Sequence, residues 1–315
     1  MPPLRIVIVA AVLCAFAAVP IIATVFAQPH YLTVLGRVLI FAIGAVSLNL
    51  VLGHGGLVSF GHAAFMGIGA YAVGIFNAYG IDNGWAQWAL GIAGAGVAGL
   101  AIGSISVRLN GIYFIMITLA FAQLLYFLAS GLTAFGGDDG MTLSSRSTFN
   151  SLIDLNNQVV MYYAIFAVLL LFLALTHQLV NSRLGIIVAG IRSNEVRMQA
   201  LGYPTYRYKL IAFVISAMMC SVSGLLLANL TDFVTAQYLT WGRSGELLIM
   251  VLLGGMASTF GPVIGATALL LFEEVASAYT DHWQLFLGPL LLLVVIYAQN
   301  GIWGWLLAYE KGRAR

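Results

Sequence analysis

The chain has 315 residues, of which 61% are hydrophobic and only 8% charged, and its mean hydropathy is +0.99. Soluble domains carry about 25% charged residues, so this composition excludes a soluble globular protein and predicts an all-α integral membrane protein surrounded by lipid. The formal net charge of +2 is too small to indicate nucleic acid as a partner.

Apolar runs recur along the chain, and most are long enough to cross a bilayer as a helix. We expect a single transmembrane domain over residues 1–315 with about ten transmembrane helices, some of them short or broken. The predicted spans are Ile6–Phe26, Leu32–Leu52, Leu57–Asn77, Ala86–Val107, Ile112–Ala129, Val159–Val180, Leu210–Leu230, Leu247–Ala257, Pro262–Ser277 and Leu285–Trp305.

The first run has two interpretations. Val25-Phe26-Ala27 resembles the cleavage site of a signal peptide. However, the 21 apolar residues of Ile6–Phe26 exceed the usual length of about 7–15 for such a peptide. This length favours an anchor that stays in the mature protein.

Glycine clusters mark two of the junctions between spans. The stretch GHGGLVSFGHAAFMGIGAY (53–71) predicts a broken or tightly packed start to the third span, and Gly254-Gly255 and Gly261-Pro262 bound a short eighth span. The clusters echo each other, Gly55-Gly56 with Phe60-Gly61 and Gly254-Gly255 with Phe260-Gly261. A parallel duplication of helices and two corners of independent origin both explain this echo.

Small residues also form stripes along two of the predicted helices, which predicts close packing between them. The stripes are Gly91, Ala95, Gly99 and Gly103 in the fourth span, and Cys220, Gly224 and Ala228 in the seventh. The two cysteines, Cys14 and Cys220, both fall inside apolar runs, and we interpret them as buried small hydrophobic residues rather than as a disulfide or metal site.

The segment 181–209 between the sixth and seventh spans is the most basic part of the chain. It carries Arg183, Arg192, Arg197, Arg207 and Lys209, five of the 13 basic residues. Short basic loops stay on the cytoplasmic side, so this segment sets the orientation and predicts cytoplasmic N- and C-termini. Arg37, Arg146 and Arg243 then fall on the outer side, against this rule, and residues 132–157 form the longest outer loop.

The same segment predicts a helix. Ile191, Glu195, Met198 and Leu201 share one helical face, and Gly202 and Pro204 follow as a stop. A short helix held between two spans on the cytoplasmic side is a part of the chain that another protein can push.

Polar residues in or beside the apolar runs are candidates for a transport pathway or gate, because such groups face protein or a water-filled path. They are Ser59, His62, Tyr71, Thr118, Gln123 and Glu246. Structural alternatives exist for three of them: His62 as a partner of a neighbouring helix, Thr118 bonded to its own helix backbone, and Glu246 paired with Arg243 at a helix start. Asp138 and Asp139, among glycines, predict turns and lack the spacing of a calcium loop.

The motifs of nucleotide hydrolysis and of common enzyme chemistry are missing. The chain has two lysines, Lys209 and Lys311, and neither follows a glycine-rich loop of the G-x-x-x-x-G-K-[ST] type. The metalloprotease motif H-E-x-x-H and the pair C-x-x-C are absent too. We therefore expect no enzymatic activity, no catalytic residues, no metal and no cofactor, but a transport pore that takes its energy from a separate ATPase.

Four stretches identify a family. They are LNLVLGHGGLVSFGHAAFMGIGAY (48–71), LNGIYFIMITLAFAQLL (109–125), SRLGIIVAGIRSNEVRMQALGYPTYRYKLIAFVISA (182–217) and SGELLIMVLLGGMASTFGPVIGA (244–266). Together they resemble the LivM-type permease subunits of the ABC importers for branched-chain amino acids. The resemblance implies a bacterial inner-membrane protein with several partners: a second, H-type permease, two ATPase subunits and a periplasmic substrate-binding protein.

The resemblance also implies a coupling helix that docks in a groove of the ATPase. The matching residues are Arg192, Asn194, Glu195, Arg197, Ala200, Leu201, Gly202 and Tyr203. The sequence departs from the wider importer pattern here, because Glu195 precedes Gly202 by seven residues instead of six and Val196-Arg197 replaces an alanine pair.

Other functions remain open at this stage. Relatives that carry urea, short amides or aromatic acids are alternatives within the same class. A self-contained secondary transporter or channel is the alternative from another class, and a neighbouring set of ATPase, permease and binding-protein genes discriminates against it.

Overall fold

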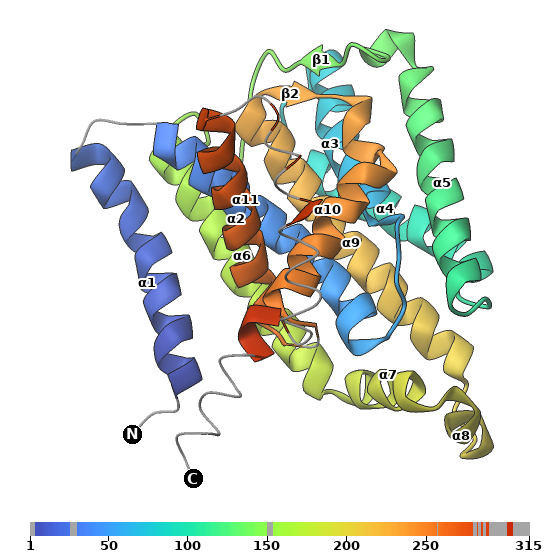
Figure 1. Ribbon diagram of the computed structural model, residues 1–315. Helices are drawn as coiled ribbons and strands as arrows, with labels where there is room; N and C mark the ends of the chain where they lie inside the picture. The colour runs from blue at the N-terminus through green and yellow to red at the C-terminus, as the bar shows by residue number, and fades with distance from the viewer. Residues whose placement is uncertain are drawn as a thin grey trace.

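The computed structural model describes residues 4–25, 30–149, 154–256, 258–279, 282, 285, 288–289 and 301–304. It consists almost entirely of helices, which confirms the predicted class (Figure 1). Seven helical segments in these ranges are long and apolar enough to cross a membrane. They comprise α1 (Leu4–Val25), α2 (His30–Asn49) with the π-helical turn η1 (Leu50–His54), α4 (Gly84–Ser106), α5 (Ile112–Ser130), α6 (Gln158–Asn181), α9 (Thr205–Thr231) and α11 (Gly261–Tyr279).

Shorter elements complete the described part of the chain. They are α3 (His62–Ala78), η2 (Thr133–Phe135), α7 (Arg183–Ser193), α8 (Glu195–Ala200), η3 (Ala236–Leu239), α10 (Trp241–Gly254), β1 (Met141–Thr142) and β2 (Phe233–Val234). Nine of the predicted spans thus correspond to helices of the structure. The tenth, Leu285–Trp305, lies mostly outside the described residues, as do the C-terminal residues.

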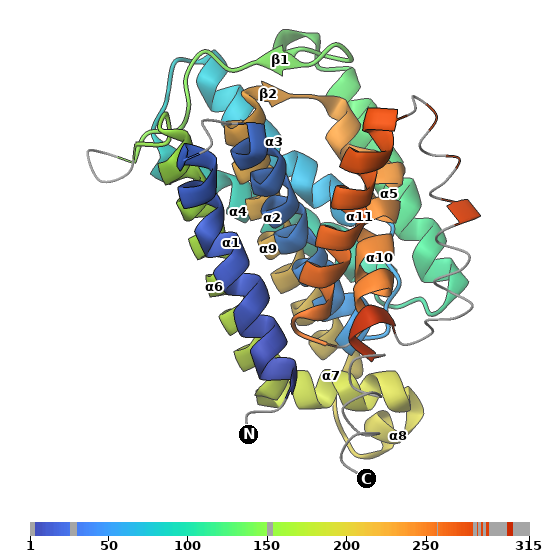
Figure 2. The same ribbon diagram turned by 60° about the vertical axis from the view of Figure 1, so that its left-hand side comes forward.

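The two ends of the helix bundle differ, and we name them for what they hold. The α7 face is the end with α7 and α8, where α1 also begins (Figures 1 and 2). The β face is the opposite end, where β1 and β2 pair antiparallel with Met141 opposite Val234. The predicted cytoplasmic segment 181–209 and the described part of the predicted outer loop 132–157 therefore lie at opposite ends of the molecule.

Helices α2, α3 and α9 form the core, α4 packs on α9, and glycines allow close contact between these helices. A Cβ atom on Gly224 of α9 would lie 1.7 Å from the Met66 carbonyl oxygen of α3, and one on Gly69 would lie 2.0 Å from that of Ser221. The stripe on α4 faces α9 as well, since a Cβ on Gly99 would lie 2.9 Å from that of Ala217. Both predicted stripes are thus confirmed as packing surfaces.

The third span begins later than predicted. Helix α3 starts at His62 rather than at Leu57, because the chain forms a π-helical turn and then a non-helical corner, in which Gly56 has φ +70°. The predicted break is confirmed and the predicted start is wrong. An equivalent corner joins α10 to α11, where Gly255 has φ +110°.

The two corners share one more contact. The Ser59 hydroxyl accepts a hydrogen bond from the amide of Gly61 at 3.2 Å, and the Ser258 hydroxyl accepts one from Gly261 at 2.9 Å. The sequence echo thus corresponds to two corners of similar local structure, each leading into a helix that rises toward the β face.

Helix α1 lies at the edge of the bundle and packs on α2 and α6. Pro20 lies inside α1 and has no amide hydrogen, so the carbonyl of Phe16 lacks its usual donor in the helix. The hydroxyl of Tyr162 on α6 donates to this carbonyl at 2.9 Å. Because α1 is peripheral, Cys14 is exposed and the prediction that it is buried is wrong, whereas Cys220 is buried as predicted.

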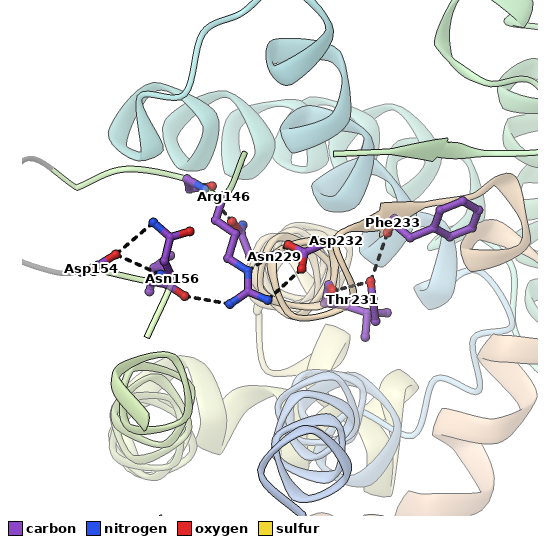
Figure 3. A network of polar contacts seen from close by, with 10 residues as sticks. Arg146, Asp154, Asn156, Asn229, Thr231, Asp232 and Phe233 are labelled. Carbon is purple, nitrogen blue, oxygen red and sulfur yellow. Dashed lines mark hydrogen bonds and ion pairs between the residues drawn. The ribbon is translucent and has the colours of Figure 1, made fainter. Parts of the chain in front are cut away.

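The β face is held together by polar contacts between the loop after α5 and the end of α9 (Figure 3). Arg146 donates to both carboxylate oxygens of Asp232, at 2.9 and 2.7 Å, and to the Leu155 carbonyl at 2.9 Å. The hydrogen bonds to Asp232 raise the pKa of Arg146 above its ordinary value, although burial opposes this. Asn229 fixes the same loop by accepting from the Ser147 amide at 2.8 Å.

Candidate functional site

The predicted coupling helix consists of two helices. Asn194 adopts an extended backbone (φ −162°, ψ 102°) and its side chain accepts from the Arg197 amide, so it ends α7 and caps α8. The predicted continuous helical face is therefore wrong: Ile191 is 5% exposed and Leu201 is 65% exposed. The stop is confirmed, since α8 ends at Ala200 and Gly202 has φ +85°.

Helix α8 is tied to the start of α9 through an ion pair. Glu195 lies 2.7 Å from the ammonium of Lys209, whose side chain is only 6% exposed. The same ammonium donates to the Asn110 side chain at 3.1 Å, in the loop between α4 and α5. A buried ammonium with two partners connects three segments, so a displacement of α8 acts on α9 and on this loop.

Helix α7 is tied to the corner between α2 and α3. The guanidinium of Arg192 donates to the Gly53 carbonyl at the end of η1. The aliphatic part of Arg192 also packs against Gly56, where a Cβ would lie 2.8 Å from the Arg192 Cγ. The corner that precedes His62 therefore rests directly on α7.

Apolar side chains on α8 and just after it point away from the protein. Val196 is 75% exposed, Leu201 is 65% exposed and Tyr203 is 40% exposed. Helix α8 lies at the extremity of the α7 face (Figures 1 and 2), and its Arg197 is exposed as well. Apolar groups clustered on an end of the molecule beyond the spanning helices mark a surface that a partner covers.

Three of the pathway candidates meet at the start of α3. His62 is fully buried, and its ring nitrogens lie 2.9 Å from the Ser59 hydroxyl and 2.8 Å from the Ser216 hydroxyl of α9. Thr118 of α5 bonds the Phe114 carbonyl of its own helix at 3.0 Å and accepts from the Phe60 amide at 3.2 Å. The structural alternatives for His62 and Thr118 are confirmed.

The hydrogen bonds around His62 fix its tautomer. The Ser216 hydroxyl donates its single hydrogen to the Ser47 carbonyl, so it accepts from the imidazole Nε2–H. Nδ1 is then the acceptor for the Ser59 hydroxyl. We assign a neutral His62 that joins α2, α3 and α9 with every ring nitrogen satisfied.

Tyr71 and Gln123 lie apart from this cluster. Tyr71 lines an apolar cavity of about 370 Å³ between α3, α4, α5 and η3, and its buried hydroxyl has no hydrogen-bond partner among the described residues. The side-chain oxygen of Gln123 on α5 is likewise buried without such a partner. Unsatisfied polar atoms of this kind are places where water or a solute binds.

Glu246 lies near the β face, in the second turn of α10. It accepts from Arg243 at 2.7 Å, which confirms the pairing predicted from their spacing. Arg243 in turn lines a pocket that the candidate list missed, together with His30, Arg37, Tyr238 and Glu274. The signal for it was present in the sequence, since Arg37 and Arg243 are two of the basic residues on the predicted outer side.

Comparison with known proteins identifies the family of this chain. The profile of the family described as "Branched-chain amino acid transport system / permease component" matches residues 30–296. The chain belongs to this family.

Relatives within the family fall into two types. LivM of Escherichia coli K12, a "high-affinity branched-chain amino acid transport system permease protein", is 30% identical in an alignment of 291 residues. The match covers 84% of this chain and 68% of that protein. LivH of the same organism is 27% identical over 286 residues, with 84% and 91% coverage. A probable LivM of Methanocaldococcus jannaschii is 23% identical over 317 residues, with 84% and 90% coverage. The predicted LivM-type resemblance is confirmed, and the chain is a multi-pass membrane permease.

Proposed function

We propose that this permease is one half of the membrane pore of an ABC importer, which moves branched-chain or other hydrophobic amino acids across the inner membrane. An H-type permease forms the other half, two ATPase subunits bind the α7 face, and a periplasmic binding protein delivers the amino acid at the β face. The chain itself hydrolyses no ATP, and its termini are cytoplasmic. The relatives named for branched-chain amino acid transport support the substrate class.

The exposure of Val196 on α8 and of Leu201 just after it carries this proposal, because α8 and the adjoining α7 are each anchored to the transmembrane helices. These two apolar side chains fit into a groove of an ATPase, and Arg197 beside them suits acidic groups at its edge. The predicted docking residues Ala200, Gly202 and Tyr203 belong to the same surface.

Two contacts, Glu195 with Lys209 and Arg192 with Gly53, connect the α7 face to the transmembrane helices. When the ATPases close, they displace α8, and the pair between Glu195 and Lys209 transmits this displacement to α9. Arg192 transmits it to the corner before α3. Because α3 and α9 meet at Gly69 and Gly224 with no room for slippage, the two helices move together and switch access from one side to the other.

The test uses the complete complex in liposomes, with ATP and leucine supplied and with the binding protein present. The double variant Val196→Glu and Leu201→Glu is expected to abolish leucine uptake and substrate-stimulated ATP hydrolysis, because charged side chains oppose apolar docking. The control is Val196→Leu with Leu201→Met, which keeps the surface apolar and is expected to keep uptake.

Two results would contradict the proposal. Normal coupled uptake by the double glutamate variant removes α8 from its role. Leucine movement through this chain alone, without ATP or partners, identifies a self-contained transporter instead.

A further inference from the structure

A charged pocket opens near the β face, between the ends of α2, α9, α10, α11 and η3. The ends of α2 and α11 lie side by side in both views (Figures 1 and 2). The pocket has a volume of about 470 Å³, which is in the range of sites for small molecules. Its walls run from His30 to Phe41 along α2, a rise of about 16 Å into the bundle.

The upper wall carries charges of both signs. Arg37 and Arg243 provide guanidinium groups, and each still has N–H donors beyond the one that it gives to Glu273 or Glu246. Glu274 provides a carboxylate, which is 44% exposed and whose ion-pair partner among the described residues is the side chain of His30, at 3.3 Å. The Tyr238 hydroxyl on the same wall has one weak contact, at 3.5 Å from the Thr231 hydroxyl.

The lower wall is apolar. Phe41 of α2 and Leu227 of α9 form it, whereas Val34 lies between His30 and Arg37, nearer the rim. The guanidinium of Arg37 lies over the Phe41 ring, 5.7 Å from its centroid. The polarity of the pocket therefore changes from charged at the rim to apolar at depth.

We propose that this pocket binds the amino acid after it leaves the binding protein, with its charged end at the rim and its side chain on the apolar floor. This rests on the proposed function and adds the place and orientation of the substrate. Arg243 and Arg37 bind the α-carboxylate, Glu274 and the Tyr238 hydroxyl bind the α-ammonium, and Phe41 and Leu227 contact the aliphatic side chain.

A purely structural role explains these residues less well. Charged side chains within a membrane-spanning region are costly, and those that face a cavity typically mark the path of a substrate or an ion. Here two arginines and a glutamate line an open volume large enough for leucine. Acceptors and donors at one end and aliphatic carbons at the other match a zwitterion with an apolar side chain, and they match neither an anion nor a cation alone.

The experiment is photolabelling of the complete complex with a leucine analogue that carries a diazirine in its side chain. We expect label on peptides that contain Phe41 and Leu227, and we expect unlabelled leucine to remove it. Two analogues test the charged contacts: 4-methylpentanoate lacks the ammonium and 3-methylbutylamine lacks the carboxylate. Each is expected to compete with the label at least about tenfold more weakly than leucine does, because it has lost one charge-assisted contact.

Two pairs of variants localise the site. Arg243→Gln is expected to reduce labelling about tenfold, and Arg243→Lys is expected to retain most of it, because it keeps the positive charge. Leu227→Trp fills the floor and is expected to abolish both labelling and uptake, whereas Leu227→Met preserves its volume and is expected to keep both.

Uptake by the unmodified complex is measured in the same preparation, which separates the two proposals. Absence of ATP-driven leucine uptake overturns the proposed function. Normal uptake with label on other segments, such as the cavity around Tyr71, or equal labelling in Arg243→Gln, overturns the pocket and leaves the importer in place.

Discussion

The arginines of the two faces differ in their partners. Near the β face, Arg37 pairs with Glu273, Arg146 with Asp232 and Arg243 with Glu246. At the α7 face, Arg183, Arg197 and Arg207 have no carboxylate within ion-pair distance among the described residues. The three apparent violations of the charge rule are therefore arginines whose charge is balanced within the protein, whereas the α7 face keeps its positive charge for lipid or for a partner.

The two faces also differ in how their segments are joined. The loop at the β face is closed by the β1–β2 sheet and by Arg146, which joins it to the end of α9. Both faces expose apolar side chains, Tyr79 and Trp85 at the β face and Val196 and Leu201 at the α7 face. The difference between the faces therefore lies in their polar contacts and not in their apolar surface.

The largest expected effect comes from separating α3 from α9, since this contact connects the faces. Gly224→Ala places a methyl group 1.7 Å from a backbone oxygen that has no room to move. We expect a loss of about 4 kcal/mol or more and no folded protein in detergent by size-exclusion chromatography. Gly94→Ala is the matched control, because its Cβ would lie 3.6 Å from Ile68, an ordinary contact. A folded Gly224→Ala variant with coupled uptake would show that the faces communicate by another route.

The second-largest expected effect is a loss of stability on replacing an arginine of the β face, compared with an arginine of the α7 face. Arg146→Gln removes a bidentate pair from a side chain that is 16% exposed, and we expect it to lower the unfolding free energy by about 2–3 kcal/mol. Arg183→Gln removes an exposed charge and is expected to change it by less than about 0.5 kcal/mol. Thermal unfolding in detergent measures both, and equal melting temperatures for the two variants would refute the distinction between the faces.

A third prediction concerns Lys209, the cation of the α7 face that has a carboxylate partner among the described residues. Glu195→Gln leaves the ammonium of Lys209 buried with a neutral partner, and we expect a loss of about 2–3 kcal/mol together with uncoupled ATP hydrolysis. Lys209→Met removes the buried charge and leaves Glu195, which is 26% exposed and can be hydrated, so it is expected to be more stable than Glu195→Gln. The order of the two melting temperatures tests this, and the reverse order would contradict it.

Much of the fold was predictable from the sequence, because apolar runs and small-residue stripes depend on local patterns. The stripe at Gly224 and the short α10 are examples. The start of α3 was not predictable to the residue, since a π-helical turn and a left-handed glycine leave no clear periodic signal. The break at Asn194 was missed because the helical period of Ile191 and Glu195 outweighed the capping tendency of a single Asn.

The site was predictable in its residues but less so in its contacts. Glu195 and Arg192 were identified from the segment, yet Lys209, Asn110 and Gly53 come to them from other helices and loops. The charged pocket depends on α2, α9, α10 and α11 together, so single stretches of sequence do not define it. The only sign of the pocket in the sequence was that Arg37 and Arg243 are basic residues on the predicted outer side, where basic residues are rare.

The smallest effect concerns α1, which lies outside the polar networks of both faces. Tyr162→Phe leaves the Phe16 carbonyl without a donor, because Pro20 supplies none, and we expect a loss of about 1 kcal/mol. Adding Pro20→Ala restores an amide hydrogen four residues after Phe16 and is expected to recover most of that loss. Tyr163→Phe is the control. Tyr163 donates to the Ala17 carbonyl, and Ile21, four residues after Ala17, has an amide hydrogen that can donate to the same carbonyl within the helix. Melting temperatures of the three variants and of the unmodified protein give the answer. Rescue by Pro20→Ala shows that the tyrosine replaces a missing helical hydrogen bond, and failure of that rescue shows that it holds α1 by packing instead.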